Sequence, residues 1–258
     1  MKIDLTGKRA IITAGADGIG RVIAKTFLEA GARVAICDIN DAALESFRGQ
    51  FPQAFAFHCD VSQPVPVAET VEKMLGALGG IDVLVNNAGS AGPTAEIENI
   101  DPADWSRTLD INLFSQFLFT KATLPLMKAQ KSGAITNMSS AAGRLGMPLR
   151  TPYAAAKWAT IGLTQSLAME VGAHNIRVNA VLPGSVRGER MERIMQARAD
   201  VTGMTFAQVE AEETATMSLG RMIEPEEVAS MIAFISSDLG ASISGQSIGV
   251  CGNMEILK

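Results

Sequence analysis

A glycine-rich loop near the start of the chain constrains the fold more than any other segment. The loop spans 13–20 and reads Thr-Ala-Gly-Ala-Asp-Gly-Ile-Gly. It follows a short apolar run at 9–13 and precedes apolar residues at helical spacing between Val22 and Leu28. A strand, a glycine turn and a helix in this order place free backbone N–H groups at a helix start, where they can bind a pyrophosphate. The loop therefore predicts a dinucleotide site.

An acidic residue directly follows the second predicted strand, at the position that would face the ribose of a bound dinucleotide. The strand spans 32–37 and Asp38 follows it. A carboxylate here can accept hydrogen bonds from both adenosine ribose hydroxyls, and it would repel a 2′-phosphate. The alternative is that Asp38 caps the helix that begins near Asp41. Asp38 therefore predicts NAD as the cofactor.

Tyr153 and Lys157 form the second informative pattern, because Tyr153 is the only tyrosine in the chain. Their i, i+4 spacing places both side chains on one face of a helix. A free phenol has a pKa of about 10, and a fixed ammonium beside it moves that pKa toward neutrality. Such pairs also occur on solvated helix faces. In a chain with a dinucleotide loop, the pair predicts an acid–base site.

Together these motifs resemble the classical short-chain dehydrogenase/reductase family, and the resemblance covers nearly the whole chain. The Asn-Asn-Ala-Gly element at 86–89 and the Pro-Gly pair at 183–184 also match in the family's order. Ala14 departs from the pattern, since the family has glycine there. The resemblance implies a catalytic tetrad of Asn112, Ser140, Tyr153 and Lys157. It implies that the following residues bind the cofactor: Gly15, Asp17, Gly18, Ile19, Gly20, Asp38, Ile39, Asp60, Val61, Asn87, Ala88, Gly89, Tyr153, Lys157, Pro183, Gly184 and Val186.

The resemblance also implies a role for each catalytic side chain. Tyr153 is expected to exchange a proton with the substrate oxygen, to which Ser140 hydrogen-bonds. Lys157 is expected to lower the tyrosine pKa and to hold the nicotinamide ribose. Asn112 is expected to anchor a water that connects Lys157 with bulk solvent. The family spacing to the tyrosine selects Ser140 over Ser139.

Strand-like and helix-like segments alternate along the chain without a break in composition. Strands are expected at 9–13, 32–37, 54–59, 81–85, 133–138, 176–181 and 247–250. Helices are expected between them, including 102–127 and 153–171. The alternation predicts an α/β protein with a parallel sheet and helices on both faces. The family order implies a doubly wound Rossmann fold, and we expect one domain over residues 1–258.

The segment at about 185–222 is the least family-like and resembles a substrate lid. Helices are expected at 189–199 and from Thr205 toward Met217, the second opening with a capping box. Five of the 13 methionines lie in this segment. They suit either an adaptable substrate surface or ordinary packing, and both readings stay open. Gly188 stands where the family usually has threonine, so the carboxamide contact of that threonine is absent or supplied by another group.

Arginines flank the expected pocket from two directions. The candidates for substrate contact are Arg150, just before the tyrosine, and Arg187 and Arg190, at the root of the lid. Arg144 and Arg193 complete the set. Guanidinium groups in this arrangement suit a carboxylate, phosphate or sulfonate. The alternative is that most of them are solvated or paired with neighbouring glutamates.

Composition excludes several classes of protein. A net charge of −5 argues against nucleic acid or an anionic membrane surface as a partner. Two histidines and no Cys-x-x-Cys leave no metal site at suitable spacing. Three cysteines in strand-like contexts suggest buried thiols in a reducing compartment. With no apolar signal segment and no run of about 18 apolar residues, a soluble cytoplasmic protein is expected.

The resulting hypothesis is an NAD-dependent oxidoreductase acting on the secondary alcohol or ketone of a small polar substrate, such as a hydroxy acid or a sugar. The alternatives are a 3-oxoacyl-carrier reductase and a nucleotide-binding scaffold without turnover. A homotetramer is expected, since family members pair through the helices near 102–127 and 153–171. Apolar residues at 113–119 exceed what one core-facing stripe needs, and the apolar chain end at 252–258 offers a second contact.

Overall fold

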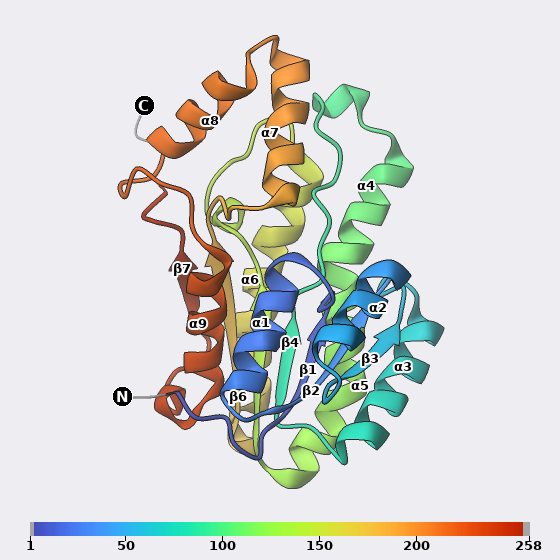
Figure 1. The fold of residues 1–258 in the computed structure, drawn as a ribbon. Coiled ribbons are helices and arrows are strands. Elements are labelled where there is room, and N and C mark those ends of the chain that lie inside the picture. The colour runs from blue at the N-terminus through green and yellow to red at the C-terminus, as the bar shows by residue number, and fades with distance from the viewer. Residues whose placement is uncertain (1–2, 255–258) are drawn as a thin grey trace.

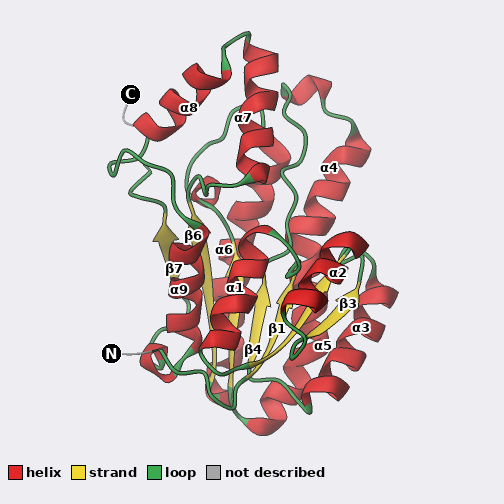
Figure 2. Cartoon of the chain, in the orientation of Figure 1, coloured by secondary structure: helices red, strands yellow, loops and turns green. Residues whose placement is uncertain are grey.

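In the computed structural model, which describes residues 3–254, seven parallel strands form one sheet with helices on both faces (Figures 1 and 2). The sheet order is β3-β2-β1-β4-β5-β6-β7. The strands are β1 (Arg9–Thr13), β2 (Arg33–Asp38), β3 (Phe55–His58), β4 (Val83–Asn86), β5 (Gly133–Met138), β6 (Ile176–Pro183) and β7 (Ser247–Val250). The order reverses between β1 and β4, and a doubly wound sheet binds its ligand at that point. The predicted Rossmann fold is confirmed.

Two layers of helices bury the two faces of the sheet. One face is covered by α1 (Gly18–Glu29), α2 (Asp41–Gln50) and α9 (Pro225–Ser236), and the other by α3 (Pro64–Leu78), α5 (Ser115–Gln130) and α6 (Thr151–Val171). Successive side chains of β1 point to opposite faces of the sheet. Ala10 and Ile12 therefore pack in the hydrophobic core on one face, and Ile11 packs in the core on the other. Burial on both faces explains why the strands read as continuous apolar runs.

The helix expected over 102–127 is interrupted, which corrects the sequence-based expectation. It consists of α4 (Pro102–Leu109), a π-turn (Asp110–Phe114) and α5. At the π-turn the side-chain amide of Asn112 donates to the carbonyl of Thr108 at 2.9 Å. That carbonyl would accept the backbone N–H of Asn112 in an α-helix, so the side chain competes with the helical ladder. The interruption leaves Asn112 fully buried behind the carboxyl ends of the strands.

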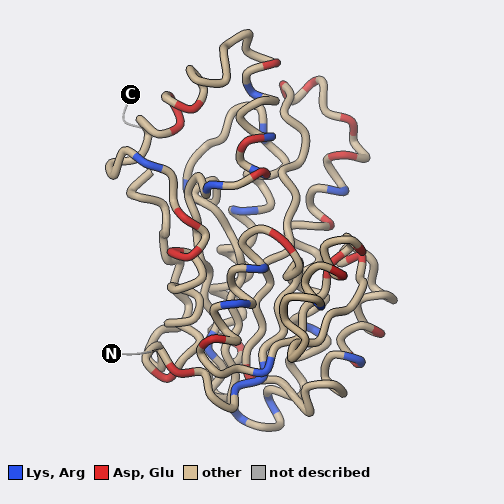
Figure 3. Tube along the Cα trace, in the orientation of Figure 1, with Lys and Arg blue, Asp and Glu red and all other residues tan. Residues whose placement is uncertain are grey.

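Helices α7 (Glu189–Thr202) and α8 (Phe206–Ala215) stand above the carboxyl ends of the strands (Figure 1). The predicted capping box at Thr205 is present. Met195 and Met222 are buried in a small cluster within this segment, and Met191 and Met204 pack against it. Most of the methionines here therefore serve the packing of the two helices against each other. Figure 3 shows acidic and basic residues alternating along α7.

Hydrogen bonds from the residues that follow β4 hold the glycine loop in a strained backbone conformation. Ala14 adopts a φ of +49°, in the left-handed region that favours glycine. The Asn87 amide donates to the carbonyls of Thr13 and Ala14 at 3.0 and 3.1 Å. The Ala88 N–H donates to the Thr13 hydroxyl at 2.9 Å. The left-handed φ explains the glycine that the resemblance expects at position 14, and the hydrogen bonds join the loop to the end of β4.

Ala14→Gly should leave the protein as stable or make it more stable. Removing the methyl relieves about 1–2 kcal/mol of left-handed strain, while the extra freedom of glycine in the unfolded chain costs about 0.4–1 kcal/mol. Gly20→Ala is the opposite case, because a Cβ there would lie 1.9 Å from the Ala14 carbonyl oxygen. It should cost about 1–3 kcal/mol. Urea unfolding compares the two variants, and a clear loss of stability in Ala14→Gly would contradict the strain argument.

The expected homotetramer stays a prediction. Phe114 and Phe117 stack at 5.7 Å between ring centroids and are exposed, as is Trp158 on α6. Leu118 and Phe119 are instead buried in the core. The apolar chain end, Ile256 and Leu257, lies outside the described residues. Light scattering should return the mass of four chains of 27.2 kDa, and Phe117→Lys should lower it. A monomer at micromolar concentration would contradict the expectation.

Candidate active site

A cavity of about 1390 Å³ opens at the carboxyl ends of the central strands and reaches under α7. It is large enough for a dinucleotide and a second ligand, since single-ligand pockets measure about 300–1,000 Å³. Of the site residues predicted from sequence, all but Gly15 and Asn112 line it. Gly15 packs against the Ile36 side chain, and its N–H donates to the carbonyl of Cys37 at 3.1 Å. The roles of the lining residues stay predictions.

The tyrosine and the lysine lie on one buried face at the start of α6. Tyr153 and Lys157 are 9% and 3% exposed, and the Lys157 ammonium lies 5.5 Å from the centroid of the tyrosine ring. Ser140 hydrogen-bonds to Tyr153 and also accepts the Ala142 N–H at 3.2 Å. Ser139 turns the other way and donates to the Lys157 backbone carbonyl at 2.7 Å. The structure thus places Ser140, and not Ser139, beside the phenol.

Opposing effects set the pKa of the tyrosine. Burial alone would raise the pKa of Tyr153, but the charges of Lys157, Arg190 and Arg150 and the Ser140 hydrogen bond bring it down to about 8. Burial disfavours the charged ammonium and lowers the pKa of Lys157 to about 8, while the charge of Tyr153 acts in the opposite direction. A phenol with such a pKa can both take and give a proton near neutral pH. The buried pair on one helix face is consistent with the predicted acid–base role, which stays a prediction.

The ammonium of Lys157 is anchored at the end of β5. It donates to the Met138 carbonyl at 2.9 Å. Asn112 lies nearby across Gly89: a methyl group added to Gly89 would sit 2.8 Å from the Asn112 Oδ1 and 3.5 Å from the Lys157 Nζ. The Asn112 Oδ1 is buried without a partner among the described residues, while its Nδ2 donates to Ser90 and Thr108. This free acceptor suits the water that the resemblance assigns to it.

The chain's own residues fit a dinucleotide at the β1 end of the cavity. Asp17 is the N-cap of α1, and the loop presents backbone N–H groups at a helix start. The Asp38 carboxylate faces the cavity and accepts the N–H groups of Ala16 and Asn40, each at 3.1 Å. The helix that follows is capped by Asn40, so the alternative of Asp38 as its cap is wrong. An ionised carboxylate with two contacts can still accept hydroxyl donors.

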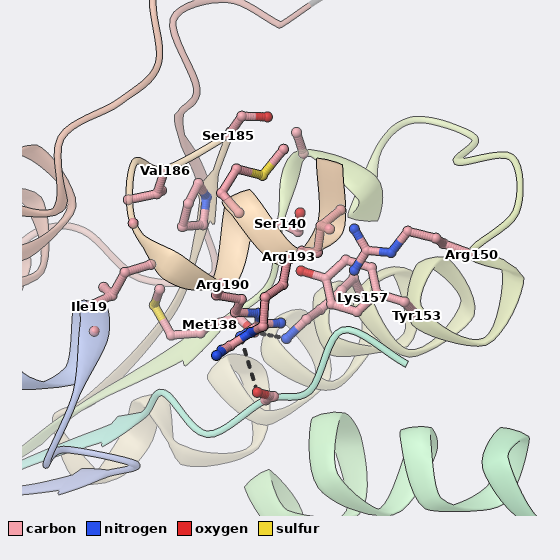
Figure 4. A pocket seen from close by; sticks show the side chains of 18 of the residues that line it. Ile19, Met138, Ser140, Arg150, Tyr153, Lys157, Ser185, Val186, Arg190 and Arg193 are labelled. Atoms are coloured by element: carbon pink, nitrogen blue, oxygen red, sulfur yellow. Dashed lines mark hydrogen bonds between the residues drawn. The ribbon is translucent and has the colours of Figure 1, made fainter. Parts of the chain in front are cut away.

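The flanking arginines separate into two groups. Arg150 and Arg190 reach the catalytic pair from the start of α6 and from α7 (Figure 4). The others have partners elsewhere: Arg187 pairs with Glu224 at 3.0 Å, Arg193 with Glu189 at 3.8 Å, and Arg144 with the Ser247 carbonyl. Arg187, a predicted substrate contact, lines the cavity with its charge already matched by a carboxylate.

Sequence reasoning missed one group at the site. Glu213 of α8 is buried, hydrogen-bonds to Ser185 at the end of β6, and pairs with Arg198 of α7 at 3.5 Å. A lone acidic residue on an expected surface helix carries no signal for such a role. Gly188 is the N-cap of α7 with a φ of +141°, where a threonine would be strained. This conformation accounts for the departure from the family's threonine.

No helix within residues 3–254 combines the length and apolar character needed to cross a bilayer. No group of three or more metal-ligating side chains forms a cluster among these residues.

Comparisons with known proteins agree with this geometry. Residues 13–254 match the family model described as enoyl-(acyl carrier protein) reductase. The 3-oxoacyl-[acyl-carrier-protein] reductase of Thermotoga maritima is 36% identical over 258 residues, covering 98% of this chain and 99% of that protein. The 2,5-dichloro-2,5-cyclohexadiene-1,4-diol dehydrogenase of Sphingobium indicum is 34% identical over 251 residues, covering 96% and 97%.

Solved structures show the same likeness. The crystal structure of an NAD⁺-bound xylitol dehydrogenase superposes with a TM-score of 0.91 at 30% identity, covering 98% of this chain and 100% of that one. An actinorhodin polyketide ketoreductase with NADPH gives a TM-score of 0.92 at 28% identity, with coverages of 97% and 98%. Sequence, fold and site geometry therefore agree that this chain belongs to the short-chain dehydrogenase/reductase family of oxidoreductases.

Proposed function

We propose that the chain is an NAD-dependent oxidoreductase that interconverts the secondary alcohol and the ketone of a small polar substrate. The observation that carries the proposal is the buried Tyr153, with its pKa lowered to about 8 beside Lys157, in the cavity that Asp38 lines at its other end. A non-catalytic scaffold would have no need to keep a buried, charge-tuned phenol.

Each catalytic residue has a defined role in this proposal. The Tyr153 oxygen takes the proton of the substrate hydroxyl, or returns it in the reverse direction. Ser140 hydrogen-bonds to the reacting oxygen and holds it against the phenol. Lys157 stabilises the phenolate and holds the nicotinamide ribose, and Asn112 positions the water through which the proton reaches solvent. Nicotinamide, when bound, supplies the hydride chemistry.

NAD is the cofactor that the charges favour. Asp38 and Asp17 both line the end of the cavity next to the glycine loop. Two carboxylates near a 2′-phosphate would oppose its binding, whereas Asp38 can accept hydrogen bonds from free ribose hydroxyls. The chain would be a single catalytic domain, with the helices α7 and α8 as its substrate lid.

A 3-oxoacyl-carrier reductase is the second candidate, because relatives named as such reach 36–38% identity. An acidic carrier protein needs a basic surface to dock on. The net charge of −5 and the alternation of charges along α7 do not favour such a partner (Figure 3). NADPH-dependent reduction of a 3-oxoacyl thioester would favour it over the main proposal.

The proposed function is tested by Tyr153→Phe. The variant keeps the ring and removes the transferable proton, so kcat should fall about 10²–10⁴-fold while NADH affinity changes little. A panel of secondary alcohols, polyols and hydroxy acids with NAD⁺ first identifies a substrate. Steady-state kinetics and NADH fluorescence titration then compare the two proteins. A variant that kept more than about a tenth of kcat would contradict the role of Tyr153.

The pH profile provides the control. Oxidation requires the phenolate, so kcat/KM for alcohol oxidation should rise with pH and level off above about 8. Reduction requires the protonated phenol, so its rate should fall above the same pH. Lys157→Met removes the charge that lowers the pKa of Tyr153 most and should move both limbs to higher pH. An unchanged profile would show that another group titrates.

Asp38→Ala should narrow the preference for NAD over NADP. The unmutated protein should bind NADH at least about tenfold more tightly than NADPH, a difference of about 1.4 kcal/mol. Because Asp38 also anchors the loop, the ratio of the two affinities is the readout. Asp41→Ala is the matched control, since Asp41 hydrogen-bonds to His58 at 2.8 Å and does not line the cavity. Equal affinities in the unmutated protein, measured by calorimetry, would refute the assignment.

A further inference from the structure

Arg150 is a buried cation without a carboxylate partner. The residue is 8% exposed, and its Nη2 donates a hydrogen bond to the Ala91 carbonyl at 3.0 Å. Its Nε is buried without a partner, and no carboxylate lies within 4 Å of its guanidinium in residues 3–254. A buried charge that is left unpaired opposes folding. Stability therefore does not explain the position of this guanidinium.

The backbone that positions Arg150 is also strained. The preceding residue, Leu149, has a φ of +65°, a region that a leucine rarely adopts. Its carbonyl is held by the Ala95 N–H at 2.9 Å. Arg150 occupies the N-cap position of α6, yet its side chain makes no capping hydrogen bond. Strain and unpaired charge at one position are typical of a functional site.

The guanidinium of Arg150 lies directly against the catalytic tyrosine. Its central carbon is 4.3 Å from the centroid of the Tyr153 ring. Its uncommitted donors are therefore within a few bond lengths of the place where a substrate oxygen would meet the Tyr153 hydroxyl and Ser140. Burial lowers the pKa of Arg150, which the charge of Tyr153 opposes.

A second unpaired arginine reaches the same place from the lid. Arg190 of α7 donates from Nη1 to the Gly89 carbonyl at 3.0 Å, and no carboxylate pairs with it in the described part of the chain. Its charge acts on both Tyr153 and Lys157. Figure 4 shows Arg150 and Arg190 on different sides of the catalytic pair. Together with Lys157, the two arginines bring three positive charges to Tyr153. Glu213 is the acidic side chain whose charge acts on Arg150.

We propose that Arg150 and Arg190 form a two-sided anion site, so that the substrate is a small hydroxy acid whose oxidised form is an oxo acid. The carboxylate would accept hydrogen bonds from the free donors of the guanidinium groups beside the catalytic pair, while the neighbouring hydroxyl meets Tyr153 and Ser140. Planar guanidinium donors match the two oxygens of a carboxylate. The close contact of Arg150 with the tyrosine ring favours an acid whose carboxylate is near the reacting carbon. This inference rests on the proposed function.

The kinetic test compares hydroxy acids with their primary amides, which have the same shape without the charge. The acid should be preferred in kcat/KM by about 100-fold or more, because a site with unpaired donors rejects the neutral analogue. Arg150→Gln and Arg190→Gln should each reduce this ratio at least about tenfold, chiefly through the KM of the acid. Arg150→Lys should give an intermediate ratio, because it keeps the charge and loses the fork.

Arg221→Gln is the matched control in the lid segment. Arg221 does not line the cavity and already pairs with Glu227 at 2.8 Å, so the ratio of acid to amide should not change. An equal loss in Arg221→Gln would indicate a general effect of positive charge in the lid segment and would overturn the assignment. So would a loss of NADH affinity in Arg150→Gln or Arg190→Gln that accounts for the kinetic effect, because the arginines would then bind the cofactor.

A binding test separates this inference from the proposed function. Malonate, malonamide and inorganic phosphate are titrated calorimetrically into the protein saturated with NADH. Malonate should bind and malonamide should not, and Arg150→Gln and Arg190→Gln should each weaken malonate at least about tenfold. If no alcohol is turned over but malonate binds selectively, the proposed function fails and the anion site stands. If acids and amides react equally, the anion site fails and the proposed function stands. Tighter binding of phosphate than of malonate would overturn the carboxylate assignment.

Stability provides a further check. Removing an unpaired buried charge should not weaken the fold, so Arg150→Met should melt at or above the temperature of the unmutated protein. A large drop in melting temperature would show that Arg150 holds the loop together, which would count against a binding role. Arg190 lies on the lid helix and makes one hydrogen bond to a backbone carbonyl, so Arg190→Gln can be tested even if Arg150 variants do not fold.

Discussion

The buried ammonium of Lys157 is the charge on which the rest of the site depends. Removing such a group from water costs several kcal/mol unless partners surround it. Here the partners come from different parts of the chain: the Met138 carbonyl at the end of β5 and the Tyr153 ring one turn earlier on α6. Because each partner comes from a separate element, the buried ammonium is surrounded by these partners only when sheet and helix are correctly assembled. Acid–base chemistry at Tyr153 is thus a property of the whole fold.

A buried polar layer under the site keeps these elements in register. The Asn86 amide on β4 donates to Asn137 on β5 at 2.9 Å and to Thr120 on α5 at 3.2 Å. The Asn137 amide donates to Thr164 on α6 at 3.0 Å. Such a network is costly to disrupt, because each unpaired group would remain out of water. It therefore opposes sliding of either helix along the two strands that carry Gly89 and Ser140.

The parts of the structure that follow from periodic burial could be predicted from the sequence. Apolar runs located the strands within a few residues, and the spacing of Tyr153 and Lys157 correctly placed both side chains on one helix face, which the structure buries. Features that depend on competition between contacts could not be predicted in this way. The π-turn arises because the Asn112 amide takes a backbone carbonyl, and the burial of Arg150 depends on a strained Leu149. Neither effect has a sequence period, and both involve residues that usually behave otherwise.

The π-turn has a consequence for how much the length of this chain can vary. It contains one residue more than an α-helical turn, and local widening of that turn takes up the extra residue, so the flanking residues keep the orientation of one helix from Pro102 to Gln130. Deleting one residue of 110–114 would make the helix regular and leave later side chains, such as the fully buried Phe119, in place. A deletion in the regular turns of α4 or α5 would instead rotate every later side chain by about 100° about the helix axis. The fold should therefore tolerate a shorter chain at the π-turn better than elsewhere in this helix, while the site would lose the widening that places Asn112 at Gly89.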